Sequence, residues 1–152
     1  MQLTTLLLAI LPALALAAPE KRCTKYWPAN VTTVSVYKAS GQASTSQIIA
    51  WNLPADATGP CALRAYFPAG YKVNSYGNSQ VNVYDVNGNS PGSMVGTVTF
   101  KSDPNQPTDL YINSFQCRSN FQYKFAIATT DGSGSVEFTQ GSAAGIYASQ
   151  GC

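Results

Sequence analysis

Bulky apolar residues alternate with polar ones most regularly between positions 121 and 127 of this 152-residue chain. Aromatic or aliphatic side chains occupy positions 121, 123, 125 and 127, and Gln122 and Lys124 stand between them. A repeat of two residues is typical of a β-strand with one buried face and one solvent-exposed face. A second strand-like run covers residues 109–116 and ends just before Cys117. We therefore predict that these two strands form the centre of a small all-β core.

Shorter alternations recur on both sides of this segment and are separated by turn-forming residues. They predict strands at residues 34–37, 48–51, 61–67, 81–84, 96–100, 136–138 and 146–147, with a short edge piece at Tyr71 and Val73. The dipeptide Asn87-Gly88 is a strong turn signal between two of these runs. Short strands at this spacing predict an antiparallel β-sandwich, of jelly-roll or immunoglobulin-like type.

The N-terminal segment has a different character, because residues 3–16 are almost entirely apolar and the first charge is Glu20. This run is shorter than the roughly 20 apolar residues of a transmembrane helix. Together with the small residues around Ala17 it predicts a secretory signal peptide at residues 1–17, with a buried N-terminal helix as the alternative. We therefore expect an extracellular protein whose mature form has no membrane anchor.

A dibasic pair, Lys21-Arg22, follows the predicted signal peptide and stands directly before Cys23. Such a pair is typical of a pro-peptide cleavage site, and it is equally compatible with two solvated charges. Residues 18–22 are thus a possible pro-peptide, and residues 23–152 are predicted to form a single β-sandwich domain of ordinary size.

The low net charge of the predicted mature chain argues against nucleic acid as a partner. Removing residues 1–22 takes away Glu20, Lys21 and Arg22, which leaves seven basic and six acidic residues and a net charge of +1. The remaining lysines are scattered along the chain rather than clustered. Because nucleic-acid binding depends on concentrated positive charge, we predict no nucleic-acid partner.

All four cysteines, at positions 23, 61, 117 and 152, lie in the predicted mature chain and predict two disulfides. Three pairings are possible. We favour Cys23–Cys152, since the two ends of a domain often lie close together. We favour Cys61–Cys117, since each of these cysteines is expected to point to the same side of its strand as predicted core residues do. Cys23 and Cys152 are expected to have no strand neighbours. Without histidine or closely spaced cysteines, the chain predicts neither a metal site nor a cofactor.

The absence of histidine also excludes Ser-His-Asp and Cys-His catalysis. A glycosidase needs only two carboxylates, and the predicted mature chain contains Asp56, Asp85, Asp103, Asp109, Asp131 and Glu137. Of these, only Glu137 falls in the interior of a predicted strand, the others lie in loops or near strand ends, and isolated carboxylates are usually just solvated. We therefore predict no catalytic residues.

Aromatic residues are the other candidates for function. Most are expected in the core, but Tyr71 and Tyr76 fall in the Gly-containing segment 69–79, which has the composition of a loop. These two tyrosines are the candidate binding residues, for a sugar ring or for another protein. Asn30, in the sequence Asn30-Val31-Thr32, is the predicted glycosylation site.

Residues 61–70, Cys-Ala-Leu-Arg-Ala-Tyr-Phe-Pro-Ala-Gly, resemble the Cys-x-Leu-x-Phe-x-Phe-Pro-x-Gly segment of a fungal secreted family. That family is named for the C-terminal domain of the ubiquitin-binding protein But-two. The resemblance continues at residues 81–84, 112–117 and 136–141 and covers roughly residues 45–150. It implies a secreted β-sandwich, supports pairing Cys61 with Cys117 and brings no catalytic residues. Ubiquitin binding is not carried over, because an exported chain would not meet cytosolic ubiquitin.

The sequence therefore predicts a small secreted fungal protein without catalytic activity, either associated with the cell wall or acting as a host-directed effector. Its partner would be a cell-wall glycan or a host extracellular protein. The alternatives are a carbohydrate-binding module and, less favoured, a small glycosidase.

Overall fold

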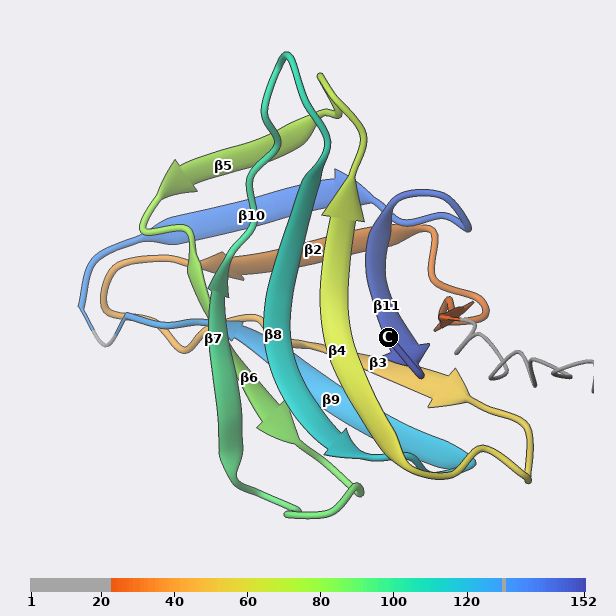
Figure 1. Cartoon of the computed structure of the whole chain (residues 1–152). Coiled ribbons are helices and arrows are strands. Elements are labelled where there is room, and N and C mark those ends of the chain that lie inside the picture. Colours follow the sequence, from red (N-terminus) through yellow and green to blue (C-terminus); the bar gives the residue numbers. More distant parts are fainter. Residues whose placement is uncertain (1–22, 130) are drawn as a thin grey trace, which may run out of the picture.

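The structure, a computed structural model, describes residues 23–129 and 131–152, and all of its regular elements are β-strands (Figure 1). They are β1 (Thr24–Tyr26), β2 (Thr33–Lys38), β3 (Gln47–Asn52), β4 (Pro60–Phe67), β5 (Val73–Gly77), β6 (Gln80–Asp85), β7 (Met94–Thr99), β8 (Thr108–Gln116), β9 (Asn120–Ile127), β10 (Gly134–Thr139) and β11 (Gly145–Gln150). The described residues contain no helix that is long and apolar enough to cross a membrane. The predicted all-β class is confirmed. The predicted signal peptide and pro-peptide lie outside the described residues.

The strands pair antiparallel into three sheets. We call them the β4 sheet (order β1-β11-β4-β8), the β10 sheet (β2-β10-β5) and the β9 sheet (β3-β9-β6-β7). In Figure 1 the β4 sheet crosses in front of the other two sheets, and β7 lies beside β8. Gly96 in β7 permits this approach, because a Cβ atom there would lie 2.5 Å from the carbonyl oxygen of Ile112 in β8.

The predicted alternation of β9 is confirmed by its burial. Phe121, Tyr123, Phe125 and Ile127 are all buried, and the residues between them are partly exposed. Trp51 of β3 lies opposite Phe121 in the register and stacks on it, with 5.5 Å between the ring centroids. The inward faces of the three sheets thus form one apolar core, which gives the predicted β-sandwich.

The two strands on either side of Cys117, which were predicted to form the centre of the core, both contribute to it but do not pair with each other. β8 pairs with β4, whereas β9 pairs with β3 and β6. The chain crosses from one layer to the other at residues 117–119, so Phe115 of β8 packs against Phe121 of β9 in a tilted arrangement, with 4.8 Å between the ring centroids. Adjacency in sequence does not set pairing here, because the partner of a strand is chosen by which apolar faces fit together.

The turn predicted at Asn87-Gly88 is confirmed and connects β6 to β7, which pair with each other. The buried carboxylate of Asp85 holds this turn by accepting hydrogen bonds from the backbone N–H groups of Gly88 and Ser90. Asp85 therefore has a structural role, in which its side chain replaces backbone partners inside a loop.

Both predicted disulfides are confirmed, with Cα–Cα distances of 4.5 Å for Cys23–Cys152 and 5.1 Å for Cys61–Cys117. Cys61 and Cys117 are buried, whereas Cys23 and Cys152 are exposed. The expectation that the terminal cysteines have no strand neighbours is wrong. Cys23 immediately precedes β1, which pairs with β11 from Thr24 opposite Gln150, so this disulfide closes the end of a two-strand ladder.

We expect the Cys61→Ser substitution to lower the free energy of unfolding more than Cys152→Ser. Loop entropy alone favours the terminal disulfide by only about 0.7 kcal/mol, since the bridges span 129 and 56 residues. Cys61→Ser also places a hydroxyl group in the apolar core, so its total cost should be about 2–5 kcal/mol. Urea unfolding of the two variants measures the difference, and an equal loss of stability would contradict the packing argument.

Candidate functional site

Two tyrosines and a serine form a row across the outer face of the β10 sheet. Tyr37 of β2 lies opposite Ser135 of β10, and Ser135 lies opposite Tyr76 of β5. The tyrosine side chains are among the most exposed large ones of the described residues, at 50% and 72%. Since the small Ser135 lies between two large side chains that project from the sheet, the row forms a depression, which we call the tyrosine groove.

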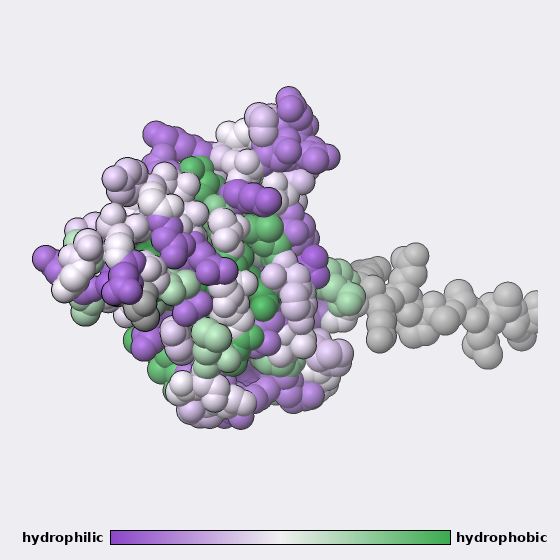
Figure 2. All heavy atoms as spheres, turned by 90° about the vertical axis from the view of Figure 1, so that its left-hand side faces the viewer, coloured by the Kyte–Doolittle hydropathy of each residue, from purple (hydrophilic) through white to green (hydrophobic). Residues whose placement is uncertain are grey.

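The tyrosine groove continues in both directions along β10. Two hollows of about 360 and 320 Å³ share Tyr37, Tyr76 and Ser135 and lie on either side of the row. One of them is bordered by the next row of the sheet, Ser35–Glu137–Asn74, so one end of the groove is polar and acidic. The side of the molecule in Figure 2 is mostly hydrophilic or neutral, with smaller apolar patches between polar residues.

Two glycines fix the position of Tyr76 in the groove. Gly77 has a φ angle of +59° and pairs with Gly134 at the end of β10. A Cβ atom on Gly134 would lie 1.9 Å from the carbonyl oxygen of Asn78, so no larger residue fits there. The close approach lets β5 pair with β10 through Tyr76 and sets the tyrosine beside Ser135.

The two tyrosines predicted from the sequence have different environments. Tyr76 belongs to the groove, but Tyr71 packs on Phe67 at 5.6 Å, and its hydroxyl donates to the carbonyl of Thr139 at 2.8 Å. The segment 69–79 was expected to be a loop apart from a short edge piece at Tyr71 and Val73. An edge strand is present, but it is longer than expected and covers Val73–Gly77 as β5, paired with β10, so Tyr76 lies on a strand and not in a loop. Tyr71 therefore braces the strand that carries Tyr76.

Tyr37 was not predicted as a binding residue, although the alternation of buried and exposed positions in its strand already indicated which way its side chain points. Val34 and Val36 are buried in β2, so Tyr37 had to face outward, away from the core. Its position opposite Ser135 could not be read in the same way, because β2 and β10 are about a hundred residues apart in the chain.

Among the residues that line the groove, Glu137 is the one carboxylate, and its side chain is exposed. Other acids of the described chain support the fold. Asp103 accepts hydrogen bonds from the backbone of Asn105 and Gln106, in the same way that Asp85 holds its turn. Within the described residues no group of three or more His, Cys, Asp and Glu side chains is placed to hold a metal ion.

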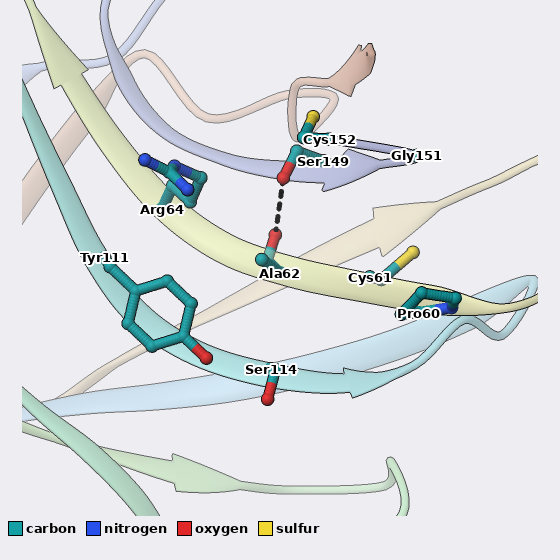
Figure 3. A pocket seen from close by; sticks show the side chains of 9 residues that line it. All are labelled: Pro60, Cys61, Ala62, Arg64, Tyr111, Ser114, Ser149, Gly151 and Cys152. Atoms are coloured by element: carbon teal, nitrogen blue, oxygen red, sulfur yellow. Dashed lines mark hydrogen bonds between the residues drawn. The ribbon is translucent and has the colours of Figure 1, made fainter. Parts of the chain in front are cut away.

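A second depression, of about 250 Å³, lies on the outer face of the β4 sheet (Figure 3). We call it the β4 hollow. Its lining residues are Pro60, Cys61, Ala62, Arg64, Tyr111, Ser114, Ser149, Gly151 and Cys152. Tyr111 belongs to the aromatic residues that the sequence offers as candidates, and the two cysteines were predicted to form disulfides, but the sequence did not predict that these residues and Arg64 meet at one hollow.

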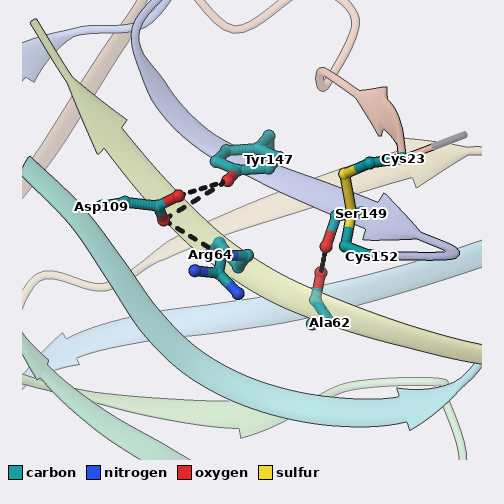
Figure 4. Close-up of polar contacts among 7 residues, drawn as sticks. All are labelled: Cys23, Ala62, Arg64, Asp109, Tyr147, Ser149 and Cys152. Carbon is teal, nitrogen blue, oxygen red and sulfur yellow. Dashed lines mark hydrogen bonds and ion pairs between the residues drawn. A yellow bond between two sulfur atoms is a disulfide. The ribbon is translucent and has the colours of Figure 1, made fainter.

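A polar network stands beside the β4 hollow (Figure 4). The Nε atom of Arg64 donates to a carboxylate oxygen of Asp109 at 3.0 Å, and the hydroxyl of Tyr147 donates to the same carboxylate at 3.1 Å. The Nζ atom of Lys25 lies 4.7 Å from the ring centroid of Tyr147, and Trp27 packs against that ring at 5.1 Å. β1 and the residue that follows it thus cover Tyr147 and keep it out of water.

This environment changes the acid–base properties of the network. Burial raises the pKa of Tyr147 to about 12, and the negative charge of Asp109 acts in the same direction. The hydrogen bond to Asp109 raises the pKa of Arg64, and burial raises the pKa of Tyr123 in the core. At neutral pH Tyr147 is therefore an uncharged donor that holds Asp109 in place, and Arg64 is cationic.

Comparison with known proteins returned no matching family model, curated protein or solved structure. The geometry of the two outer faces is therefore the basis for the functional proposals.

We expect Tyr147 to ionise well above the ordinary tyrosine pKa of 10, with a midpoint near pH 12. Subtracting the ultraviolet titration of Tyr147→Phe from that of the unmodified protein isolates this group. The unfolded chain loses the tyrosine proton first, so this residue's contribution to stability should fall as pH rises from 10 to 12. Asp109→Asn should lower the midpoint, and an unchanged midpoint would contradict the assigned electrostatic effect.

Proposed function

We propose that this chain is a small secreted protein without catalytic activity, and that its tyrosine groove binds a neutral glycan of the fungal cell wall. The observation that carries the proposal is the exposed pair Tyr37 and Tyr76, set one strand to either side of Ser135. Two strand spacings separate the tyrosine backbones, about 9.5 Å, which leaves room for sugar rings along β10.

The chemistry of the groove suits a sugar chain. Tyrosine rings present a flat apolar face for the C–H groups of a sugar ring, and their hydroxyls reach toward water. The serine, asparagine and carboxylate side chains of the next row offer hydrogen-bond partners for sugar hydroxyls. Because both tyrosines stand on paired strands, ligand binding need not order a flexible loop.

Binding without turnover is favoured over glycoside hydrolysis by the content of the groove. Hydrolysis normally needs two carboxylates, on opposite sides of the scissile bond. Glu137 is the single acid among the residues that line the groove, and the chain has no histidine to act as a base. We assign Glu137 to hydrogen bonding with the ligand.

An extracellular location is supported by the apolar N-terminal segment and by two disulfides, which form in oxidising compartments. The resemblance to a fungal secreted family adds support for export. Since an exported fungal protein passes through the glycans of its own cell wall, the proposal names a wall glycan as the ligand.

We expect the purified protein to bind at least one of chitin, β-glucan and cellulose in pull-down assays. Tyr37→Ala and Tyr76→Ala should each weaken binding about tenfold or more, since truncating a central aromatic side chain removes most of its contact area. Soluble oligosaccharides of the retained polymer allow the dissociation constant to be measured by calorimetry.

Ile48→Ala is the matched control, because Ile48 is a similarly exposed large side chain, at 55%, on the β9 sheet, and it lines neither the tyrosine groove nor the β4 hollow. Loss of binding in that variant, or retention in both groove variants, would contradict the assignment. Capture of a host extracellular protein with no glycan retained would favour the effector role. Oligosaccharide turnover abolished by Glu137→Gln would instead identify a glycosidase.

Asn30 should carry an N-linked glycan when the chain is exported by a eukaryotic host. Its side chain is exposed and its φ angle of 63° places it in a turn. Intact mass should show a chain that begins at Ala18 or Cys23, with an added glycan that an endoglycosidase removes. The Asn30→Gln variant should lack this addition, and a mass that retains Met1 would contradict export by signal cleavage.

A further inference from the structure

The β4 hollow has a floor of small residues. Ala62 of β4 lies opposite Ser149 of β11 on one side and opposite Ser114 of β8 on the other. The next row is Tyr147–Arg64–Tyr111, and the large side chains of Arg64 and Tyr111 form one wall of the hollow (Figure 3). The hollow therefore exists because a row of short side chains adjoins a row of long ones. It lies on a different sheet from the tyrosine groove.

Arg64 is held in one orientation at this wall. Asp109 fixes its Nε atom, and the guanidinium carbon lies 6.0 Å from the ring centroid of Tyr111. Hydrogen bonds between described residues occupy only Nε of this side chain, which is 29% exposed. The two Nη groups thus remain as donors on a guanidinium whose position is already set.

The charges around the hollow favour an anion. Asp109 is the one acid of the network, and its carboxylate already accepts hydrogen bonds from Arg64 and Tyr147. Lys25 stands next to Ser149 in the register, with its Nζ atom near the rings of Tyr66 and Tyr147. Counted over these side chains, Arg64 and Lys25 outweigh Asp109 by one positive charge.

We propose that the β4 hollow is a second binding site, which takes the carboxylate of a uronic acid residue in an acidic glycan. The Nη groups of Arg64 match the two oxygens of a carboxylate. The exposed ring of Tyr111 offers a face for the sugar ring, and Ser114 offers a hydroxyl. A hollow of about 250 Å³ suits a single sugar residue rather than a long segment.

A uronic acid fits this position better than an acidic peptide does. β4 is paired on both edges, with β11 and with β8, so an extended peptide cannot add to it through backbone hydrogen bonds. The hollow instead presents a charged donor, hydroxyl groups and one aromatic face, which is the set of contacts that a charged sugar ring uses.

Isothermal titration of the full mature chain with trigalacturonic acid, and with its methyl ester, tests the proposal. The acid should bind and the ester should not, because esterification removes the charge while keeping the sugar skeleton. Arg64→Gln should weaken binding of the acid by roughly tenfold to a hundredfold, the range for hydrogen bonds to charged groups. Arg64→Lys should retain part of the affinity, since lysine keeps the positive charge but lacks the two parallel N–H donors of the guanidinium group.

Ala62→Val provides a test that leaves the Arg64–Asp109 pair intact. It fills the floor with a side chain suited to strands, so it should weaken binding without lowering the melting temperature. Tyr76→Ala should leave trigalacturonate binding unchanged, which separates this site from the tyrosine groove. No binding of the acid, equal binding of the ester, or unchanged affinity in Arg64→Gln would overturn the proposal. Equally tight, Arg64-dependent binding of a hexaglutamate peptide would overturn its assignment to a sugar.

Discussion

Aromatic packing between the three sheets is the interaction on which the rest of this structure depends. Phe67 of the β4 sheet lies 5.1 Å from Phe138 of the β10 sheet, and Phe138 lies 5.0 Å from Phe100. Phe100 in turn packs against Phe125 of the β9 sheet at 6.5 Å. Edge-on and tilted ring contacts of this kind add to the burial energy of each ring. The three sheets therefore share one core.

This packing also decides which residues face water. Since side chains alternate along a strand, burying Val34 and Val36 turns Tyr37 outward, and burying Leu63 and Ala65 turns Arg64 outward. A slip of one residue in either strand would exchange the two faces. The composition of the tyrosine groove and of the β4 hollow thus follows from the requirement to bury the opposite side of the same strands.

The two outer faces offer different chemistry. The tyrosine groove combines two exposed rings with one carboxylate, which suits an uncharged ligand, whereas the β4 hollow carries Arg64 beside the short side chains of its floor. The Cys23–Cys152 disulfide adjoins the hollow and ties β1 to β11, which keeps Lys25 over Tyr147. Stability and site geometry are therefore coupled on the β4 sheet, while the β10 sheet relies on the close approach of Gly77 and Gly134.

The sequence by itself determined the features that depend on local periodicity or on cysteine placement. The buried face of β9, the turn at Asn87-Gly88 and both disulfides were predicted correctly. Tertiary structure decided which strands are neighbours. It placed β8 and β9 in different sheets and brought Tyr37 and Tyr76 to either side of Ser135. It also gave Tyr71 a structural role, through the hydrogen bond of its hydroxyl to Thr139. The physical reason is that alternation encodes only which side of a strand is buried, whereas pairing depends on how apolar faces from distant segments fit together.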